Sequence, residues 1–422
     1  MNGKTILPLM LIVMLSAIFF CGCVSQPQGN QTPTATATAT VTVTPTVTTT
    51  TPVSNAVYTQ DEFNLSLMWR DLWEDHIIWT RMVIINIADI PGGTNESVTR
   101  LLQNYEDMGD AMRPYYGDAA ANQFADLIDN HLLIAADLVK AAKANNTTAV
   151  KSLETQWYAN ADQIAAFQES INPNWDTNMT MQMWHDHLAA TEAEAVARIS
   201  KNYTADAAAF DTVHAQAVKM ADSMSDGIRT QFPAKFPGPK TRTQAELDLY
   251  NAMRYLWTDH TVWTRMYIIS SLANSTDAPV AAARLLKNQE DIGNAIKPLY
   301  GDAAGNNLTA LLKQHILIAV DIINAVKAQN STAQAAAEAA WTQNADQIAN
   351  LLSGANPYLP NQVVKDLMYT HLATTKDELV ARYTMNYPAD VAAWDIVYDH
   401  IKMMSDALSG GIIQQFPQKF GK

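Results

Sequence analysis

Histidine is the residue type whose chemistry and spacing most suggest a site in this chain. Three histidines recur at a fixed offset of 184 residues, and each lies on the apolar stripe of a different predicted helix. The recurring residues are His76 with His260, His131 with His315, and His187 with His371. Neutral imidazoles bind zinc, copper, iron and nickel. The pattern therefore allows one three-histidine transition-metal site in each half of the chain.

The usual metal motifs of helical bundles do not accompany these histidines. The Glu-x-x-His motif of ferritin-like di-metal sites is absent. The positions four residues after the first-half histidines are Thr80, Ala135 and Thr191. Glu194 follows His187 by seven residues, which is about 10.5 Å along a helix. This separation keeps those two side chains from holding one ion.

A buried polar network is the second interpretation, and the one that the sequence favours. A histidine on an apolar face needs partners for both ring nitrogens. Polar residues that recur in both halves could supply them. These residues are Asp75, Thr80, Arg81, Thr191, Glu194 and Arg198, with their counterparts Asp259, Thr264, Arg265, Thr375, Glu378 and Arg382. A third interpretation is a small-ligand pocket lined by these groups and by Trp73, Trp79 and Trp157.

Other signs of chemistry are few. His185, His214 and His400 do not recur at equivalent positions, and we expect them on the surface. The sequence contains no Gly-rich phosphate loop, no Gly-x-Ser-x-Gly elbow and no His-Glu-x-x-His motif. It therefore favours a non-enzymatic role in ligand binding, sensing or cell-surface structure, with a metalloprotein or metalloenzyme as the alternative. It identifies no cofactor, and a transition metal is the one that it allows.

The charge of the chain bears on its partners. The formal net charge is −14, and no Lys/Arg-rich block is present. This composition argues against nucleic acid, because nucleic-acid binding depends on a basic surface. A small ligand or another surface protein are the partners that remain.

The chain consists largely of a duplication. Residues 68–236 align with residues 252–420 without a gap, and 74 of the 169 positions are identical. A period this long is a duplicated domain and not a solenoid repeat. The junction Pro237-Gly238-Pro239 separates a first domain at 56–237 from a second at 240–422.

The composition of each copy predicts an all-α fold. Alanine is abundant, and glycine and proline are mostly confined to short junctions. We expect each copy to be a helical bundle with four long helices and additional short ones. The short helices include a pair at 96–103 and 104–113, with Asn104 as a cap, before a break at residues 114–117.

Residues 1–23 are typical of an export signal with a lipobox. Lys4 precedes an apolar run at 6–20, which is shorter than a full membrane span of about 20 residues. Cleavage after Gly22 would leave Cys23 to carry a lipid. An uncleaved N-terminal helix is the alternative. Both readings attach the protein to the cell membrane and place its body on the extracellular face.

The region after the signal also fits an exported protein. Residues 24–55 form a Thr/Pro-rich tether that we expect to be disordered, and the body that follows contains no cysteine. Ten Asn-x-Ser/Thr sequons indicate a glycoprotein. The matched sequons at Asn146 and Asn330 fall at a predicted turn between helices.

Two resemblances follow from these segments. The lipobox, Thr-rich tether, sequons and acidic body resemble surface lipoproteins of methanogenic archaea. Each repeat resembles an uncharacterised all-helical family of spore-forming bacteria and some archaea, through its Asp-His-x-x-Trp-Thr-Arg, Tyr-Gly-Asp-Ala, Asn-Ala-Asp-Gln-Ile-Ala and Gln-Phe-Pro-x-Lys-Phe segments. The names attached to that family, glycosyltransferase and sugar kinase, find no support in these residues. The resemblance implies a domain boundary and no mechanism.

The substitution Cys23→Ser tests the lipobox. We expect it to abolish lipid attachment and to leave a precursor of higher mass, because the lipidated thiol is lost. Mass spectrometry and membrane fractionation would measure both effects. An intact leader and equal membrane partitioning in both forms would support the uncleaved helix instead.

Overall fold

The computed structural model describes residues 55–422. The export signal, Cys23 and the tether up to residue 54 lie outside the described residues. Within the described part, ten α-helices are accompanied by two short strands and two 3₁₀ helices. The predicted all-α class is confirmed.

The same series of elements occurs twice along the chain. The first copy contains β1 (Ala56–Tyr58), α1 (Gln60–Ala88), α2 (Thr94–Lys143), α3 (Thr147–Ile171), α4 (Thr177–Ile199), α5 (Tyr203–Gln231) and η1 (Pro233–Lys235). The second copy contains β2 (Arg242–Thr243), α6 (Gln244–Leu272), α7 (Ala278–Lys327), α8 (Ser331–Ala355), α9 (Asn361–Tyr383), α10 (Tyr387–Gln415) and η2 (Pro417–Phe420). We refer to the two copies as the first and second repeat.

Side chains at the helix starts explain where the helices begin. Thr59 accepts a hydrogen bond from the backbone N–H of Glu62, whose carboxylate accepts from the backbone N–H of Thr59. This reciprocal capping box satisfies two N–H groups that a helix start leaves without partners. Asn146 and Asn330 cap α3 and α8, and both lie exposed at the turn where they were expected.

The predicted number and bounds of the helices in each repeat require a correction. Each repeat has five helices, and the predicted short pair at 96–103 and 104–113 is the first part of one long helix, α2. Asn104 lies inside that helix and is not a cap. The chain bends at Gly117, where φ is 78° and ψ is 174°, inside the break predicted at residues 114–117. Only glycine adopts this conformation without strain, and Gly301 repeats it in α7.

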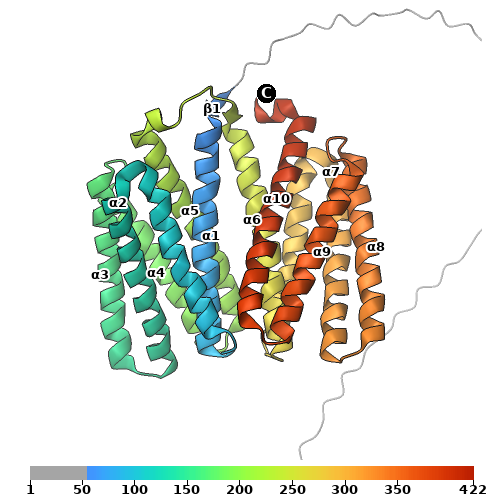
Figure 1. Ribbon diagram of the computed structural model, residues 1–422, viewed down its shortest axis with the longest axis horizontal. Helices are drawn as coiled ribbons and strands as arrows, with labels where there is room; N and C mark the ends of the chain where they lie inside the picture. The colour runs from blue at the N-terminus through green and yellow to red at the C-terminus, as the bar shows by residue number, and fades with distance from the viewer. Residues whose placement is uncertain (1–54) are drawn as a thin grey trace, which may run out of the picture. The chain divides into compact units, whose positions relative to one another are not determined.

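Each repeat closes into a ring of five helices. In the first repeat α1 packs on α2 and α5, and α3 and α4 complete the ring. The second repeat has the same neighbours in the same order, from α6 to α10. Figure 1 shows the two bundles side by side, with α1 and α6 near the centre. Tryptophans dominate the first core, where Trp69, Trp73 and Trp184 are completely buried.

The two repeats contact each other through equivalent residues. Arg100 bonds Asp75 of its own repeat at 2.7 Å and Asp395 of the other repeat at 3.1 Å. Arg284, which is Arg100 shifted by 184 residues, bonds Asp259 and, at 2.8 Å, Asp211.

Cation–π contacts cross the same interface in both directions. Arg81 lies over the ring of Trp263 at 5.2 Å, and Arg265 lies over that of Trp79 at 5.5 Å. A contact from i to j that is returned from j to i is the mark of a two-fold interface. The repeats are therefore related by an approximate two-fold axis inside one chain.

These contacts join the repeats into one compact unit. The strands β1 and β2 add an antiparallel pair between the repeats. The junction at residues 237–239 lies between η1 and β2, as the predicted boundary requires. Independent folding of 56–237 and 240–422 stays a prediction.

One described helix, α7, is long and apolar enough to cross a membrane by length and composition. Helices in the core of a soluble bundle meet the same criterion. In this structure α7 packs on α6 and α8, as its counterpart α2 packs on α1 and α3. Its role in the second repeat is therefore that of a bundle helix.

Separate production of fragments 56–237 and 240–422 tests the boundary. Each is expected to be soluble, helical by circular dichroism and cooperative in unfolding, because each contains a closed ring of helices. Mixed together, they should associate one to one, because Arg100 and Arg284 otherwise lose Asp395 and Asp211.

The double substitution Asp211→Asn and Asp395→Asn is the matched control. It should weaken the association, measured by analytical ultracentrifugation, and leave the helicity of each fragment unchanged. If neither fragment folds alone, the repeats form a single cooperative domain and the boundary is wrong.

Candidate metal centre

The structure brings three recurring histidines together in the first repeat. His76 comes from α1, His131 from α2 and His187 from α4, and each is at most 2% exposed. Their ring centroids are 5.5–6.2 Å apart. One ring nitrogen from each residue lies within 4.8 Å of the other two. We call these three residues the histidine triad.

Each histidine of the triad is held by a side-chain amide. The Nδ1 atoms lie 3.0–3.2 Å from an amide oxygen on the next helix along the chain. The pairs are His76 with Asn104, His131 with Asn160, and His187 with Gln216. In sequence, the amide follows its histidine by 28 or 29 residues.

The orientation of each amide is itself fixed. The NH₂ group donates to the backbone carbonyl four residues before the histidine, at 2.7–3.1 Å. These carbonyls belong to Leu72, Leu127 and Met183. The amide oxygen must then face the imidazole, and Nδ1 must carry the hydrogen. We call this arrangement the amide relay.

The amide relay determines the chemistry of the triad. With a hydrogen on Nδ1, the Nε2 atom of each neutral ring carries a lone pair. Among residues 55–422, no hydrogen bond forms to the Nε2 atoms of His76, His131 and His187. Three nitrogens around a tetrahedral zinc ion would be about 3.3 Å apart. One nitrogen of each ring lies within 4.8 Å of the other two, so the rings would move toward one another to hold one ion.

Burial keeps the triad neutral. It lowers the pKa of His76 to about 4 and that of His187 to about 3, and it lowers the pKa of His131 well below its usual value. Indole rings surround the imidazoles. Trp157 lies 5.2 Å from His131, and Trp184 lies 5.3 Å from the same ring. Metals bind the neutral form of imidazole, so the triad is in its ligand state at neutral pH.

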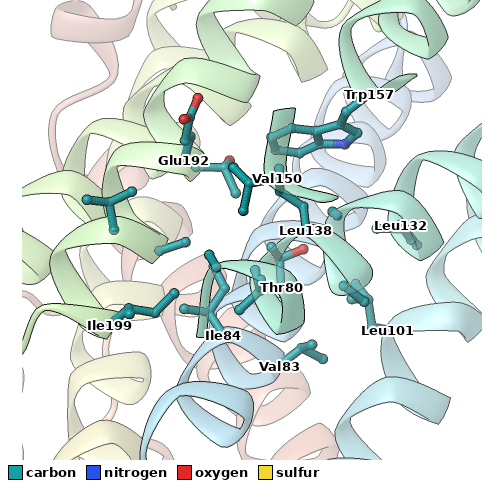
Figure 2. Close-up of a pocket in the computed structure, with 17 residues that line it drawn as sticks. Thr80, Val83, Ile84, Leu101, Leu132, Leu138, Val150, Trp157, Glu192 and Ile199 are labelled. Carbon is teal, nitrogen blue, oxygen red and sulfur yellow. The ribbon is translucent and has the colours of Figure 1, made fainter. Parts of the chain in front are cut away.

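An apolar pocket in the first repeat is lined by residues one helical turn along the chain from the triad. Figure 2 shows the residues that line it. Thr80 and Thr191, which line it, follow His76 and His187 by four residues. Their hydroxyls donate to the backbone carbonyls of those histidines at 2.7 and 2.9 Å. The threonines therefore form a layer between the pocket and the imidazoles.

The second repeat keeps only part of this arrangement. His315 retains its amide, with Nδ1 at 2.9 Å from Asn344. The Nδ1 atom of His260 instead accepts from Gln289 at 3.2 Å, so the hydrogen of that ring lies on Nε2. His371 has no partner for Nδ1, because His400 occupies the position equivalent to Gln216. Within residues 55–422, only the first-repeat triad meets the 4.8 Å criterion.

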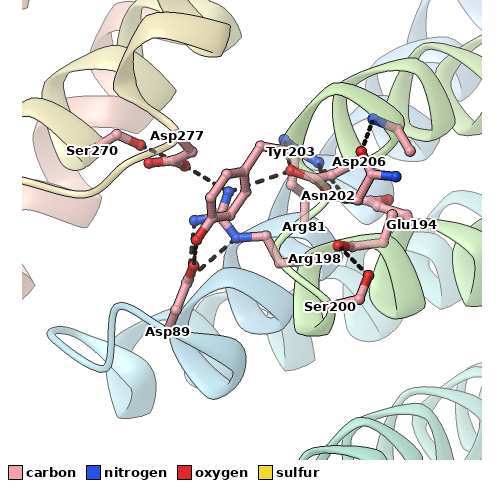
Figure 3. A network of polar contacts seen from close by, with 12 residues as sticks. Arg81, Asp89, Glu194, Arg198, Ser200, Asn202, Tyr203, Asp206, Ser270 and Asp277 are labelled. Carbon is pink, nitrogen blue, oxygen red and sulfur yellow. Dashed lines mark hydrogen bonds and ion pairs between the residues drawn. The ribbon is translucent and has the colours of Figure 1, made fainter. Parts of the chain in front are cut away.

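The polar residues predicted to serve the histidines bond elsewhere. Arg81 lies 2.6 Å from Glu194 and 2.9 Å from Asp206, in a fully buried ion network (Figure 3). Burial raises the pKa of Glu194, and the arginine opposes this effect. Asp75 pairs with Arg100. The expected bonds from the histidines to Glu194 and Thr191 are therefore wrong.

The ion network is repeated, with one difference. Arg265, Glu378 and Asp390 reproduce the first-repeat contacts at 2.6 and 2.9 Å. Arg198 also reaches Asp89 at 2.9 Å and Asp277 of the second repeat at 2.6 Å. Its counterpart Arg382 bonds only Asp390, because Ala273 and Gly93 stand at the positions of those aspartates.

The amides are the site residues that sequence reasoning did not identify as partners. Asn104 and Asn160 recur in both repeats, and Gln216 does not. The regular interval of 28 or 29 residues after each histidine was the available signal. Over such an interval the chain continues to the end of one helix, turns, and runs back along the next helix. The amide then lies at the same height in the bundle as its histidine.

Comparison with known proteins adds no assignment. No protein-family model matches the chain, and no curated protein or solved structure matches it.

Two of the histidines expected on the surface are buried. His400 is 5% exposed, and His214 is 1% exposed in the contact between the repeats. His214 donates to Glu74 at 3.0 Å and to Asp259 at 3.3 Å. The ring of Tyr255 stacks on it at 4.0 Å. Burial opposes the charged form, but the two carboxylates prevail and raise the pKa of His214 to about 9.

The charge of His214 makes the contact between the repeats depend on pH. Its pKa is higher in the folded protein than the 6.5 of a free imidazole. Its contribution to stability is therefore complete below about pH 6.5 and is lost as the pH rises through about 9. His214→Gln should destabilise the protein more at pH 6 than at pH 9.5, as measured by denaturant unfolding.

His185→Gln serves as the control, since His185 is partly exposed and bonds only Asp162. Equal destabilisation by His214→Gln at both pH values would contradict a buried imidazolium.

Proposed function

We propose that the first repeat binds one transition-metal ion through His76, His131 and His187. The amide relay is the observation that carries this proposal. Metal-binding histidines in proteins generally donate their second ring N–H to a fixed acceptor, which sets the tautomer and orients the ring. Three independent relays here give the same tautomer to three neighbouring rings.

A polar network without metal explains the triad less well. Three neighbouring neutral rings each carry one lone pair, and each lone pair needs a donor. A single water molecule has two hydrogens, so one nitrogen stays without a partner. A buried polar atom left in this state costs about 1–3 kcal/mol. One metal ion accepts all three lone pairs at once.

The ligand set limits which ions fit. Imidazole nitrogen suits zinc, copper, iron and nickel. Three protein ligands leave one position of a tetrahedral ion for water or another ligand, as in catalytic zinc sites. The three rings are neutral, so a divalent ion keeps its full charge in a tryptophan-lined interior. That arrangement favours an anionic fourth ligand on Zn²⁺, or a monovalent ion such as Cu⁺.

The cellular setting belongs to the same proposal. The Cys23 lipobox or an uncleaved N-terminal helix would hold the protein on the outer face of the cell membrane, where the sequons at Asn146 and Asn330 could be glycosylated. A non-enzymatic ligand-binding role at the cell surface is the second candidate. The apolar pocket beside the triad is the observation that favours it.

Metal analysis of the purified full-length chain tests the metal site. After incubation with Zn²⁺ or Cu⁺ and gel filtration, we expect one equivalent per chain by elemental mass spectrometry. His131→Ala should remove the ion, and the matched variant His315→Ala of the second repeat should retain it. Asn160→Leu should weaken binding about 10–100-fold in a chelator competition, because outer ligands orient the inner ones.

Absence of stoichiometric metal in the wild-type chain would contradict the proposal. Loss of the ion in His315→Ala with retention in His131→Ala would place the site in the second repeat. Circular dichroism of each variant separates loss of ligand from loss of fold.

A further inference from the structure

The pocket beside the triad has a volume of about 70 Å³ and opens between helices of the first repeat (Figure 2). Its walls come from α1, α2, α3 and α4. Aliphatic side chains such as Ile84, Leu132 and Val139 make most of the lining, and Trp157 closes one end. Trp157 also packs on His131, so one indole touches both the pocket and the triad.

The second repeat fills the same space with larger side chains. Ala195, which lines the pocket, corresponds to Leu379, and this leucine is 4% exposed. The other replacements are Val320 for Ala136, Val326 for Ala142, and Tyr267 for Val83. The same backbone therefore accommodates either small or large residues at these positions. Small residues are present only in the repeat that carries the triad with its complete amide relay.

Packing in the two cores reflects this difference. In the first repeat, Ile84, Val139 and Ala195 form a small cluster separated from the main hydrophobic core. In the second repeat, the corresponding Ile268, Ile323 and Leu379 belong to the main core. The pocket is the gap that separates the first group from its core. A dry gap forfeits the packing that its lining would otherwise gain, so an occupant would restore it.

The side chains that line the pocket indicate the polarity and charge of the ligand that it can bind. The hydroxyls nearest the triad, of Thr80 and Thr191, already donate to backbone carbonyls. Glu192 is the one charged residue of the lining, and it is only partly buried. No charged group is available to pair with an ionic ligand in the interior of the pocket. An aliphatic cavity of about 150 Å³ binds xenon or benzene, and this pocket has about half that volume.

From these observations, we propose that the first repeat binds a small, uncharged, apolar atom or molecule, smaller than a benzene ring, in this pocket. The ligand would lie one helical turn, about 6 Å, from the imidazoles of the triad. The inference depends on the shape and lining of the pocket and does not require the metal. The proposal of an apolar ligand can therefore be contradicted by experiment while the proposal of a metal site holds, and the reverse.

Xenon observed by ¹²⁹Xe NMR is a suitable probe for the full-length chain. We expect saturable binding to the wild type and at least a tenfold rise in Kd in Ala195→Leu. This substitution introduces the side chain that the second repeat already accommodates. Ala136→Val introduces the smaller valine that the second repeat has at the equivalent position. It tests the proposal if Ala195→Leu does not fold.

A second apolar pocket supplies the matched control. It has a volume of about 40 Å³ and is lined by Met253, Leu308 and Leu359 of the second repeat. The first repeat fills that space with Trp69, Phe124 and Trp175. Met253→Trp should therefore close the second pocket and leave the Kd for xenon in the first pocket unchanged.

The outcomes distinguish the two pockets. Loss of binding in Ala195→Leu or Ala136→Val with retention in Met253→Trp supports the proposal. Retention in both alanine variants, with loss in Met253→Trp, assigns the probe to the second repeat and overturns it. Absence of binding to the wild type up to the solubility of the probe also overturns it. Metal content measured on the same samples shows whether the triad is intact.

Discussion

A buried imidazole has two ring nitrogens, and each must find a partner inside the bundle. This constraint organises the first repeat. Three amides take the Nδ1 hydrogens, and three carbonyls on the histidine-bearing helices orient those amides. Every helix that carries a triad residue is thereby tied to the helix that follows it. What remains is one lone pair on each of three neighbouring rings, and the metal ion proposed above would accept all three.

The two repeats are more alike in the ion pairs that hold the helices together than in the residues around the histidines. Both repeats keep the arginine–carboxylate network and the reciprocal pairs of Arg100 and Arg284 across the interface. They differ in the partners of the histidines and in the lining of the apolar pocket. Gln216 is replaced by His400, and the residue equivalent to Ala195 is Leu379. The contact between the repeats is also asymmetric, because His214 faces Glu74 where the reverse positions hold Tyr398 and Thr258. Only the first repeat keeps an amide oxygen beside Nδ1 of all three of its recurring histidines.

The sequence predicted what depends on periodicity along one helix. The stripes identified the helical class, the buried positions of the recurring histidines and the break near Gly117. They did not identify the partners of the rings, because these depend on how neighbouring helices are rotated in space. Glu194 was expected near His187, but it lies two turns further along α4, where it bonds Arg81 of α1. His214 was expected on the surface because it does not recur in the second repeat, but a residue that faces the other repeat can also lack a counterpart. Nothing in a single-helix pattern separates these two cases.

The central claim concerns where an ion binds, so an anomalous difference map from metal-soaked crystals tests it most directly. Data collected on both sides of the zinc or copper absorption edge would locate the ion without assumptions about stoichiometry. The account predicts one strong peak about 2.0–2.1 Å from the Nε2 atoms of His76, His131 and His187, and none among His260, His315 and His371. An ordinary density peak at the triad without anomalous signal, as a water molecule gives, would contradict it.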